Sequence, residues 1–337
     1  LACSWNDAGI PELNFINWGS SHGQLEGLYG RLNYDVTLCN HFLEKTEGMD
    51  DAKTVLQRAE ARFIRALNFF YLMDLFGNVP FTEIVTTELP MQIQRADLFK
   101  YLETELLDME ADMYEPREAP FGRADKAAAW FLLSRMYLNA EVYTGTARWS
   151  DAATYAKKVI DSNYQLCSNY AHLFMADNDQ NADAKQEIIL PIRQDGKYIR
   201  SYGGSLYAIA AMHTNGMPSW GTSEGWGGVR ARKALVDKFF ESRSLTVPVP
   251  GLPEDMVAAA KDDRALFYSG GNQFVNAENE VETDGNRTVE ISDINVFKEG
   301  LSITKWSNVR SDGKSTTDPQ WTDTDIPFFR LGEVYLN

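Results

Sequence analysis

The segment that decides the fold is LQRAEARFIRALNFFYLMDLFGNVP, residues 56–80. Apolar side chains recur in it every three or four residues, which is the spacing of one face of an α-helix. The apolar set is Leu56, Ala59, Phe63, Ala66, Leu67, Phe70 and Leu75. Gly77 and Pro80 follow as stop signals. The segment therefore predicts a long amphipathic helix that ends near Gly77.

The same pattern recurs on both sides of this helix. The further apolar stripes run from Leu25 to Phe42, Leu98 to Met113, Ala128 to Leu138 and Ala153 to Ile160. Asp125 and Ser150 precede the last two stripes as typical N-cap residues. Helix pairs at this period, loosely near 34 residues, are typical of tetratricopeptide repeats. We therefore expect a tetratricopeptide-like scaffold over residues 20–161.

The rest of the chain has a different character. Residues 162–322 hold most of the glycines, prolines and isolated aromatic residues, which indicates a loop-rich part where binding residues are expected. Residues 323–337 are predicted to start a further repeat helix. We expect a mainly α fold, one domain over residues 1–337, truncated at both ends. A lipid anchor would lie upstream of Leu1.

Composition excludes several classes of function. The 337 residues carry a formal net charge of -16, which disfavours nucleic acid and anionic membrane surfaces as partners. The four histidines are scattered, and the three cysteines show no CxxC spacing, so the sequence predicts neither a zinc site nor a disulfide framework. Hydrolase, phosphate-loop and dinucleotide motifs are all absent from the sequence. We expect a protein that is not an enzyme.

The acidic run DNDQNADAKQE, residues 177–187, carries a possible metal signal. It spaces oxygen ligands at Asp177, Asp179 and Asn181 and closes on Glu187, as calcium loops do. The match to an EF-hand loop is partial, and a solvated acidic turn is the alternative. If calcium is bound here, we expect it to be structural.

Three aromatic residues lie in irregular segments. Trp5 is followed by Asn6 and Asp7, while Tyr202 and Trp226 each precede two glycines. Rings in such places can stand out from loops, where they stack on the apolar face of a sugar while amide and carboxylate groups bind its hydroxyls. The alternative is that the tryptophans are buried under the loops, as most are.

At this point the sequence resembles a known family. Five runs carry the resemblance, at residues 58–81, 122–128, 187–193, 262–265 and 324–331. Together they resemble the SusD/RagB-like outer-membrane lipoproteins of Bacteroidetes, and a starch-binding member is the most similar. The resemblance extends over nearly the whole chain.

The resemblance implies a non-catalytic surface lipoprotein of the outer membrane that binds starch or malto-oligosaccharides and delivers them to a SusC-type TonB-dependent transporter. It maps an arc of three sugar-stacking rings onto Trp5, Tyr202 and Trp226, and a calcium ion near residues 177–187. The segment after Trp5 is one residue shorter than in the family, so either Asn6 or Asp7 takes the polar role. Another glycan, a helical-repeat protein adaptor and a glycosidase remain as alternatives.

Overall fold

The computed structural model describes residues 2–3, 5–200, 221–223, 225–271, 273–275, 277–278 and 280–337. The chain forms two compact units. The helical unit comprises Ser21–Leu166, Gln186–Pro191 and Phe328–Asn337. The loop-rich unit comprises Leu1–Ser20, Cys167–Lys185 and Ile192–Pro327. The prediction of a mainly helical fold is confirmed.

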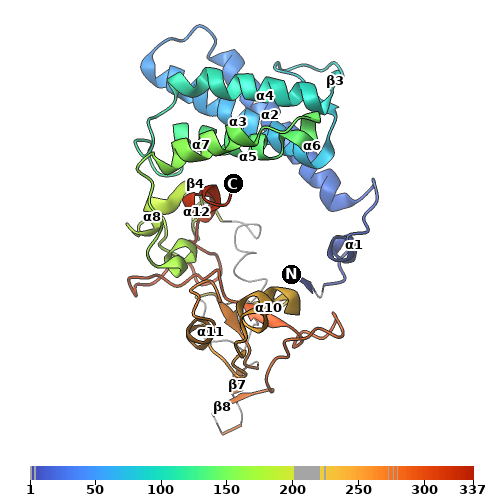
Figure 1. The fold of residues 1–337 in the computed structure, drawn as a ribbon, viewed down its shortest axis with the longest axis vertical. Helices are drawn as coiled ribbons and strands as arrows, with labels where there is room; N and C mark the ends of the chain where they lie inside the picture. The colour runs from blue at the N-terminus through green and yellow to red at the C-terminus, as the bar shows by residue number, and fades with distance from the viewer. Residues whose placement is uncertain are drawn as a thin grey trace. The chain divides into compact units, whose positions relative to one another are not determined.

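The helical unit consists of paired helices. Its helices are α2 (Gly23–Lys45), α3 (Ala52–Phe76), α4 (Arg95–Met109), α5 (Lys126–Leu138), α6 (Ala140–Thr144) and α7 (Trp149–Ile160), with a 3-10 turn at Glu110–Asp112 and the short strands β2 (Val79–Pro80) and β3 (Gln92–Ile93) between them. Helix α3 packs against α2 and α4, and α5 packs against α7 (Figure 1). Within the described residues, no helix combines the length and the apolar character needed to cross a membrane.

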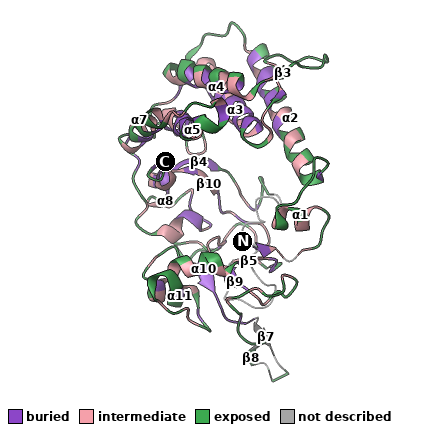
Figure 2. Ribbon diagram, turned by 45° about the vertical axis from the view of Figure 1, so that its right-hand side comes forward, coloured by how far each residue is buried: buried purple, intermediate pink, exposed green. Residues whose placement is uncertain are grey.

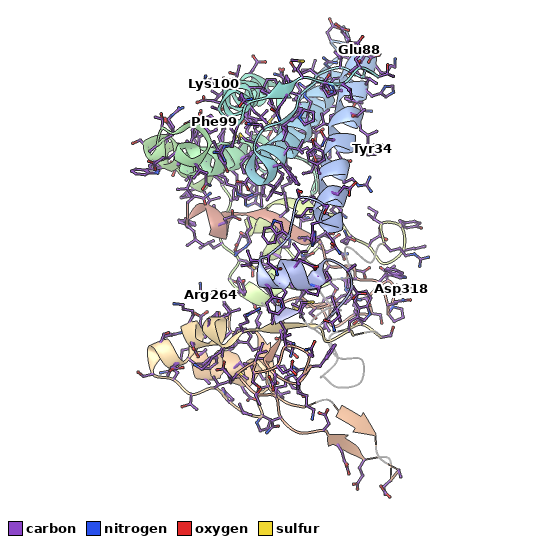
Figure 3. All side chains as sticks on the ribbon, turned by 90° about the vertical axis from the view of Figure 1, so that its right-hand side faces the viewer. Tyr34, Glu88, Phe99, Lys100, Arg264 and Asp318 are labelled. Carbon is purple, nitrogen blue, oxygen red and sulfur yellow. The ribbon has the colours of Figure 1, made fainter. Side chains whose placement is uncertain are left out.

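Most helices of this unit bury one side, as the buried residues of α3 and α4 show (Figure 2). Helix α5 is buried on nearly all sides, and Leu138 is its one exposed residue. On α4, Phe99 is buried in the core, whereas its neighbour Lys100 is exposed (Figure 3). Helix α5 begins as predicted, because Asp125 Oδ1 accepts a hydrogen bond from the Ala128 amide at 3.2 Å. Gly77 ends α3 with a φ of 80°, a conformation that favours glycine.

The charged residues of α3 tie the helices together. Arg62 donates two hydrogen bonds to Glu105 of α4, at 2.9 and 2.7 Å, and Arg65 donates a third at 2.9 Å. Burial alone would raise the pKa of Glu105, but the hydrogen bonds and charges of the two arginines outweigh it and lower that pKa. The carboxylate therefore stays ionised between two cations, which is how buried charges are tolerated.

The prediction of a helix over residues 323–337 is wrong for most of that range. Ile326–Arg330 form strand β10, and only Leu331–Val334 are helical, as α12. Strand β10 pairs with β4 (Ile188–Ile192), and Phe329 stacks on Phe131 of α5 with ring centroids 4.3 Å apart. Pairing to a partner far away in the sequence, which local periodicity does not reveal, gives this segment its structure.

The loop-rich unit is built on a small antiparallel sheet. Its strand order is β1 (Ala2–Cys3), β5 (Val229–Ala231), β9 (Leu301–Ile303) and β6 (Phe267–Tyr268). The other described helices are α1 (Ile10–Phe15), α8 (Ala184–Glu187), α10 (Lys233–Phe239) and α11 (Pro253–Ala260), with 3-10 turns at Tyr170–Phe174 and Glu241–Arg243. Strands β7 (Gln273–Val275) and β8 (Val281–Thr283) form a hairpin. The last two residues of α8 belong to the helical unit. Val236, Phe240, Met256 and Leu301 belong to a core of its own.

Candidate functional site

Two of the predicted sugar-stacking rings lie next to each other. Trp5 follows β1 and Trp226 precedes β5, and these strands pair antiparallel with Cys3 opposite Val229. Continuing that register brings Trp5 and Trp226 to the same end of the strand pair. Their ring centroids are 5.7 Å apart, with the ring planes inclined at 69°. Residues more than two hundred positions apart in sequence are thus brought together by one strand pair.

Gly228 makes room for the Trp5 ring. A Cβ atom at this position would lie 2.2 Å from Cε2 of Trp5, far inside van der Waals contact. The ring therefore lies directly over the backbone of residue 228. The sequence shows two glycines after Trp226, but it does not reveal that the second one supports Trp5.

Both tryptophans remain partly accessible to solvent. The exposed fraction of Trp226 is 38%, and Trp5 is half-buried. Asn6 and Asp7, which follow Trp5 in the loop that leads to α1, are exposed. Tyr202, the third predicted ring, lies outside the described residues. The described part of the site is therefore a pair of inclined, accessible rings beside an amide and a carboxylate.

The predicted calcium ligands mostly have protein partners. Asp177 accepts hydrogen bonds from the amide and hydroxyl of Ser311, at 2.8 and 2.7 Å. The side-chain oxygen of Asn181 accepts hydrogen bonds from the backbone amides of Asp183 and Ala184. Glu187 accepts a hydrogen bond from Arg330 at 2.7 Å, and it belongs to the helical unit, whereas the other three predicted ligands belong to the loop-rich unit. A calcium site built from these four residues stays a prediction.

A different carboxylate in the loop-rich unit is buried among charges. Asp325 is fully buried, and its carboxylate lies 2.9 Å from Arg193 Nε and accepts a hydrogen bond from the Gln194 amide at 2.6 Å. Burial raises the pKa of Asp325 to about 7, and the nearby charges of Asp179 and Asp195 act in the same direction. The sequence does not point to this residue as a site residue, because it lies almost 150 positions from Asp177, where the acidic run begins.

The sequence is similar to a known family. Residues 17–138 match the SusD-like family described as "Starch-binding associating with outer membrane". This match spans α2, α3, α4 and α5, four of the five helices that the periodic segments predict. Over these residues the sequence is similar to those of SusD-like proteins.

Its relatives include the starch-binding protein SusD of Bacteroides thetaiotaomicron, which is 48% identical over 361 aligned residues. That alignment covers 99% of this chain and 64% of the relative, so the chain spans about two thirds of the relative's length.

Solved structures share the fold at much lower identity. A SusD-like carbohydrate-binding protein from Bacteroides fragilis has a TM-score of 0.71 and 21% identity, covering 95% of this chain and 61% of that one. A structure with a xylogluco-oligosaccharide has a TM-score of 0.71 and 19% identity, covering 98% of this chain and 63% of that one. These likenesses concern the fold alone.

Proposed function

We propose that this protein binds starch and malto-oligosaccharides, without catalysis, through a platform that includes Trp5 and Trp226. The observation that carries the proposal is the pair of accessible rings next to β1 and β5, with Gly228 beneath Trp5. The 48% identity to a starch-binding protein supports this choice of glycan. Asn6 and Asp7 would supply hydrogen bonds to sugar hydroxyls, and Tyr202 would complete the arc.

The inclination of the rings favours a curved ligand. Two planes at 69° cannot both lie flat against an extended, flat glucan such as cellulose. Successive sugars of a coiled α-1,4-glucan turn, so one face can meet each ring. Because a shallow platform buries little area and a flexible sugar loses conformational entropy on binding, we expect a modest affinity for a single short chain.

A different glycan is the second candidate. A neighbour with the same fold was solved with a xylogluco-oligosaccharide, so this fold accommodates more than one type of glycan. The protein-adaptor alternative has less support, because it requires the loop tryptophans to be buried, and Trp226 is more than one third exposed.

The cellular role that we propose follows from the family. The matching family is described as associating with the outer membrane. We place this protein at the cell surface as a lipoprotein held by an N-terminal lipid, passing bound glucan to a SusC-type TonB-dependent transporter. The net charge of -16 agrees with a role that needs neither nucleic acid nor an anionic lipid surface as partner.

Structural calcium is part of the proposal, with its best support around Asp325 rather than Glu187. Asp325 is fully buried, and Asp179 and Asp195 lie close enough to influence its charge. Carboxylate oxygens are the ligands that calcium prefers. A hard cation here would add to the compensation that Arg193 provides at 2.9 Å, and it would fix the irregular chain around it.

Electrophoresis through native gels that contain amylopectin, dextran, levan or xylan tests the choice of glycan. We expect amylopectin alone to retard the wild-type protein and Trp226→Ala to migrate freely in it. Trp149→Ala is the matched control, because Trp149 is also exposed but lies on α7 of the helical unit. Retardation of Trp226→Ala equal to that of the wild type would contradict the platform, and retardation by xylan instead would favour the second candidate. Release of shorter chains from maltoheptaose would contradict the absence of catalysis.

A further inference from the structure

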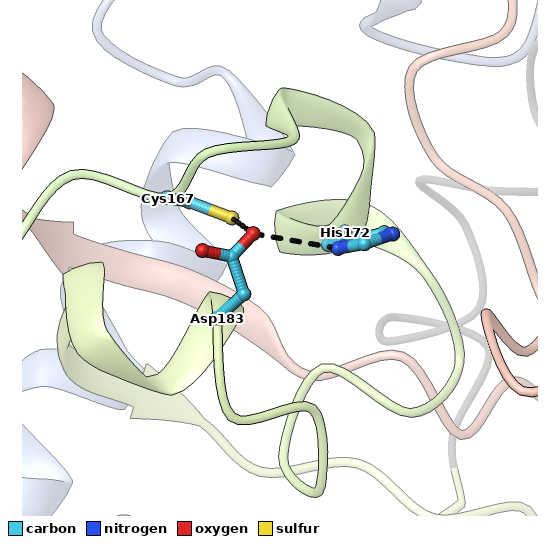
Figure 4. A group of neighbouring side chains, drawn as sticks. All are labelled: Cys167, His172 and Asp183. Carbon is cyan, nitrogen blue, oxygen red and sulfur yellow. Dashed lines mark hydrogen bonds and ion pairs between the residues drawn. The ribbon is translucent and has the colours of Figure 1, made fainter.

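Three side chains of different chemistry meet in the loop-rich unit. Cys167 precedes the 3-10 turn Tyr170–Phe174, His172 lies within that turn, and Asp183 immediately precedes α8. One ligand atom from each residue lies within 4.8 Å of the others. Figure 4 shows the thiol of Cys167 and the ring of His172 on either side of the Asp183 carboxylate.

The separations of these atoms fit a tetrahedral metal centre. Cys167 Sγ lies 3.1 Å from Asp183 Oδ2, and His172 Nδ1 lies 3.5 Å from the same oxygen. Zinc binds sulfur at about 2.3 Å and nitrogen or oxygen at about 2.0–2.2 Å, so tetrahedral angles place its ligand atoms roughly 3.3–3.6 Å apart. Small side-chain movements would therefore be enough to admit an ion.

The carboxylate is held in place as an anion. Asp183 Oδ1 accepts a hydrogen bond from the Ser168 amide at 2.9 Å, and Oδ2 accepts from the Ser168 hydroxyl at 3.0 Å and the Asn169 amide at 3.1 Å. These three hydrogen bonds hold the carboxylate in a fixed position. A fixed negative charge next to a thiol favours a cation at this position.

The imidazole offers a nitrogen without a hydrogen bond. His172 Nδ1 is buried and makes no hydrogen bond, although it faces the Asp183 carboxylate. The other ring nitrogen, Nε2, contacts the side-chain amide of Asn169 at 3.2 Å, which fixes the ring orientation. Metal-ligating histidines are typically held in this way through the nitrogen that does not bind the metal.

We propose that Cys167, His172 and Asp183 bind one divalent transition-metal cation of the zinc type, through Sγ, Nδ1 and Oδ2, with water as the fourth ligand. The sulfur binds as thiolate, so each metal ion that binds releases the thiol proton to solvent. Sulfur and nitrogen ligands select zinc-type ions over calcium or magnesium, which prefer oxygen alone. The bound ion would link Cys167 and Asp183, the two ends of residues 167–183.

Cobalt provides a direct spectroscopic test on the whole chain. Titration of the metal-free protein with Co²⁺ should produce a thiolate-to-cobalt charge-transfer band in the near ultraviolet that saturates at one ion per chain. Zn²⁺ should abolish the band, whereas Ca²⁺ and Mg²⁺ should not. Cys167→Ser should lose the band, and His172→Gln should weaken Co²⁺ binding at least tenfold. Cys3→Ser is the matched control, because Cys3 is also half-buried, and it should keep the band.

A second measurement does not depend on the folding of the variants. In the wild-type protein, Zn²⁺ should slow alkylation of Cys167 by iodoacetamide at least tenfold, with peptide mass spectrometry separating this residue from Cys3. The absence of a charge-transfer band at saturating Co²⁺ would overturn the proposal. An alkylation rate of Cys167 that Zn²⁺ does not change would also overturn it. So would a folded His172→Gln variant that binds Co²⁺ as tightly as the wild type.

Discussion

Adding one methyl group at Gly228 tests the ring platform more strictly than removing a ring. In Gly228→Ala both tryptophans remain, and so does the sugar-facing chemistry of the loop. The new Cβ would lie 2.2 Å from Cε2 and 2.4 Å from Nε1 of Trp5. The φ angle of Gly228 is not positive, so the backbone accepts alanine, and the whole effect falls on the neighbouring ring.

The size of the effect follows from this overlap. Ordinary contact requires about 3.4 Å, so the Trp5 ring must move by roughly 1.2 Å or rotate away. Because Trp5 is only half-buried, the ring can leave without opening the core, and we expect the free energy of unfolding to fall by about 1 kcal/mol. A stacking residue displaced this far should cost about 1.4 kcal/mol or more in binding, a tenfold loss of affinity.

Isothermal titration calorimetry with maltoheptaose measures this loss, and urea denaturation measures the stability. Gly30→Ala is the control, because Gly30 lies within α2 and a Cβ there meets nothing within 4 Å. We expect that variant to bind like the wild type and to be slightly more stable. If folded Gly228→Ala binds maltoheptaose with wild-type affinity, the position of Trp5 does not matter and the platform reasoning fails.

Two further predictions concern stability. Glu105→Gln should lower the free energy of unfolding by about 3 kcal/mol, because Arg62 and Arg65 lose their shared carboxylate; a loss below about 1 kcal/mol in urea denaturation would contradict the ionic argument. The fold lowers the pKa of Glu105. The stabilisation that Glu105 provides is therefore complete above its unfolded pKa of about 4.3 and is lost as pH falls through the folded pKa. The difference in free energy of unfolding between wild type and Glu105→Gln should accordingly shrink in acid. Removal of calcium should lower the Tm of the wild type but not that of Asp325→Asn. Asp97→Asn, at an exposed position, is the control and should respond to calcium like the wild type. A wild-type Tm that does not change with calcium would refute the calcium site around Asp325.

Local periodicity was enough to predict the long helices of the helical unit but not the small sheets. The stripe from Leu56 to Leu75 predicts α3 because a helix buries residues that are close in sequence, and Asp125 caps α5 through an amide only three residues away. Strands β1 and β10 have only two and five residues, and their partners lie far along the chain. Such short segments carry too little alternation to separate a strand from a helix or a loop.

The candidate sites show the same limit. The glycines after Trp226 indicated an exposed ring, but only the pairing of β1 with β5 brings Trp5 beside it. Glu187 fitted the spacing of a calcium loop, yet it forms an ion pair with Arg330, which no spacing rule within the loop could reveal. Cys167, His172 and Asp183 escaped a search for repeated cysteines or histidines because each contributes a different ligand type.

The division of the chain also determines when the helical unit can finish folding. Phe329, Leu331 and Val334 belong to its hydrophobic core, although Ile192–Pro327, a part of the loop-rich unit, precede them in the sequence. A ribosome makes the long helices well before it makes these three residues. The nascent helices must therefore wait with an unfilled apolar surface, a state prone to aggregation and suited to chaperone binding.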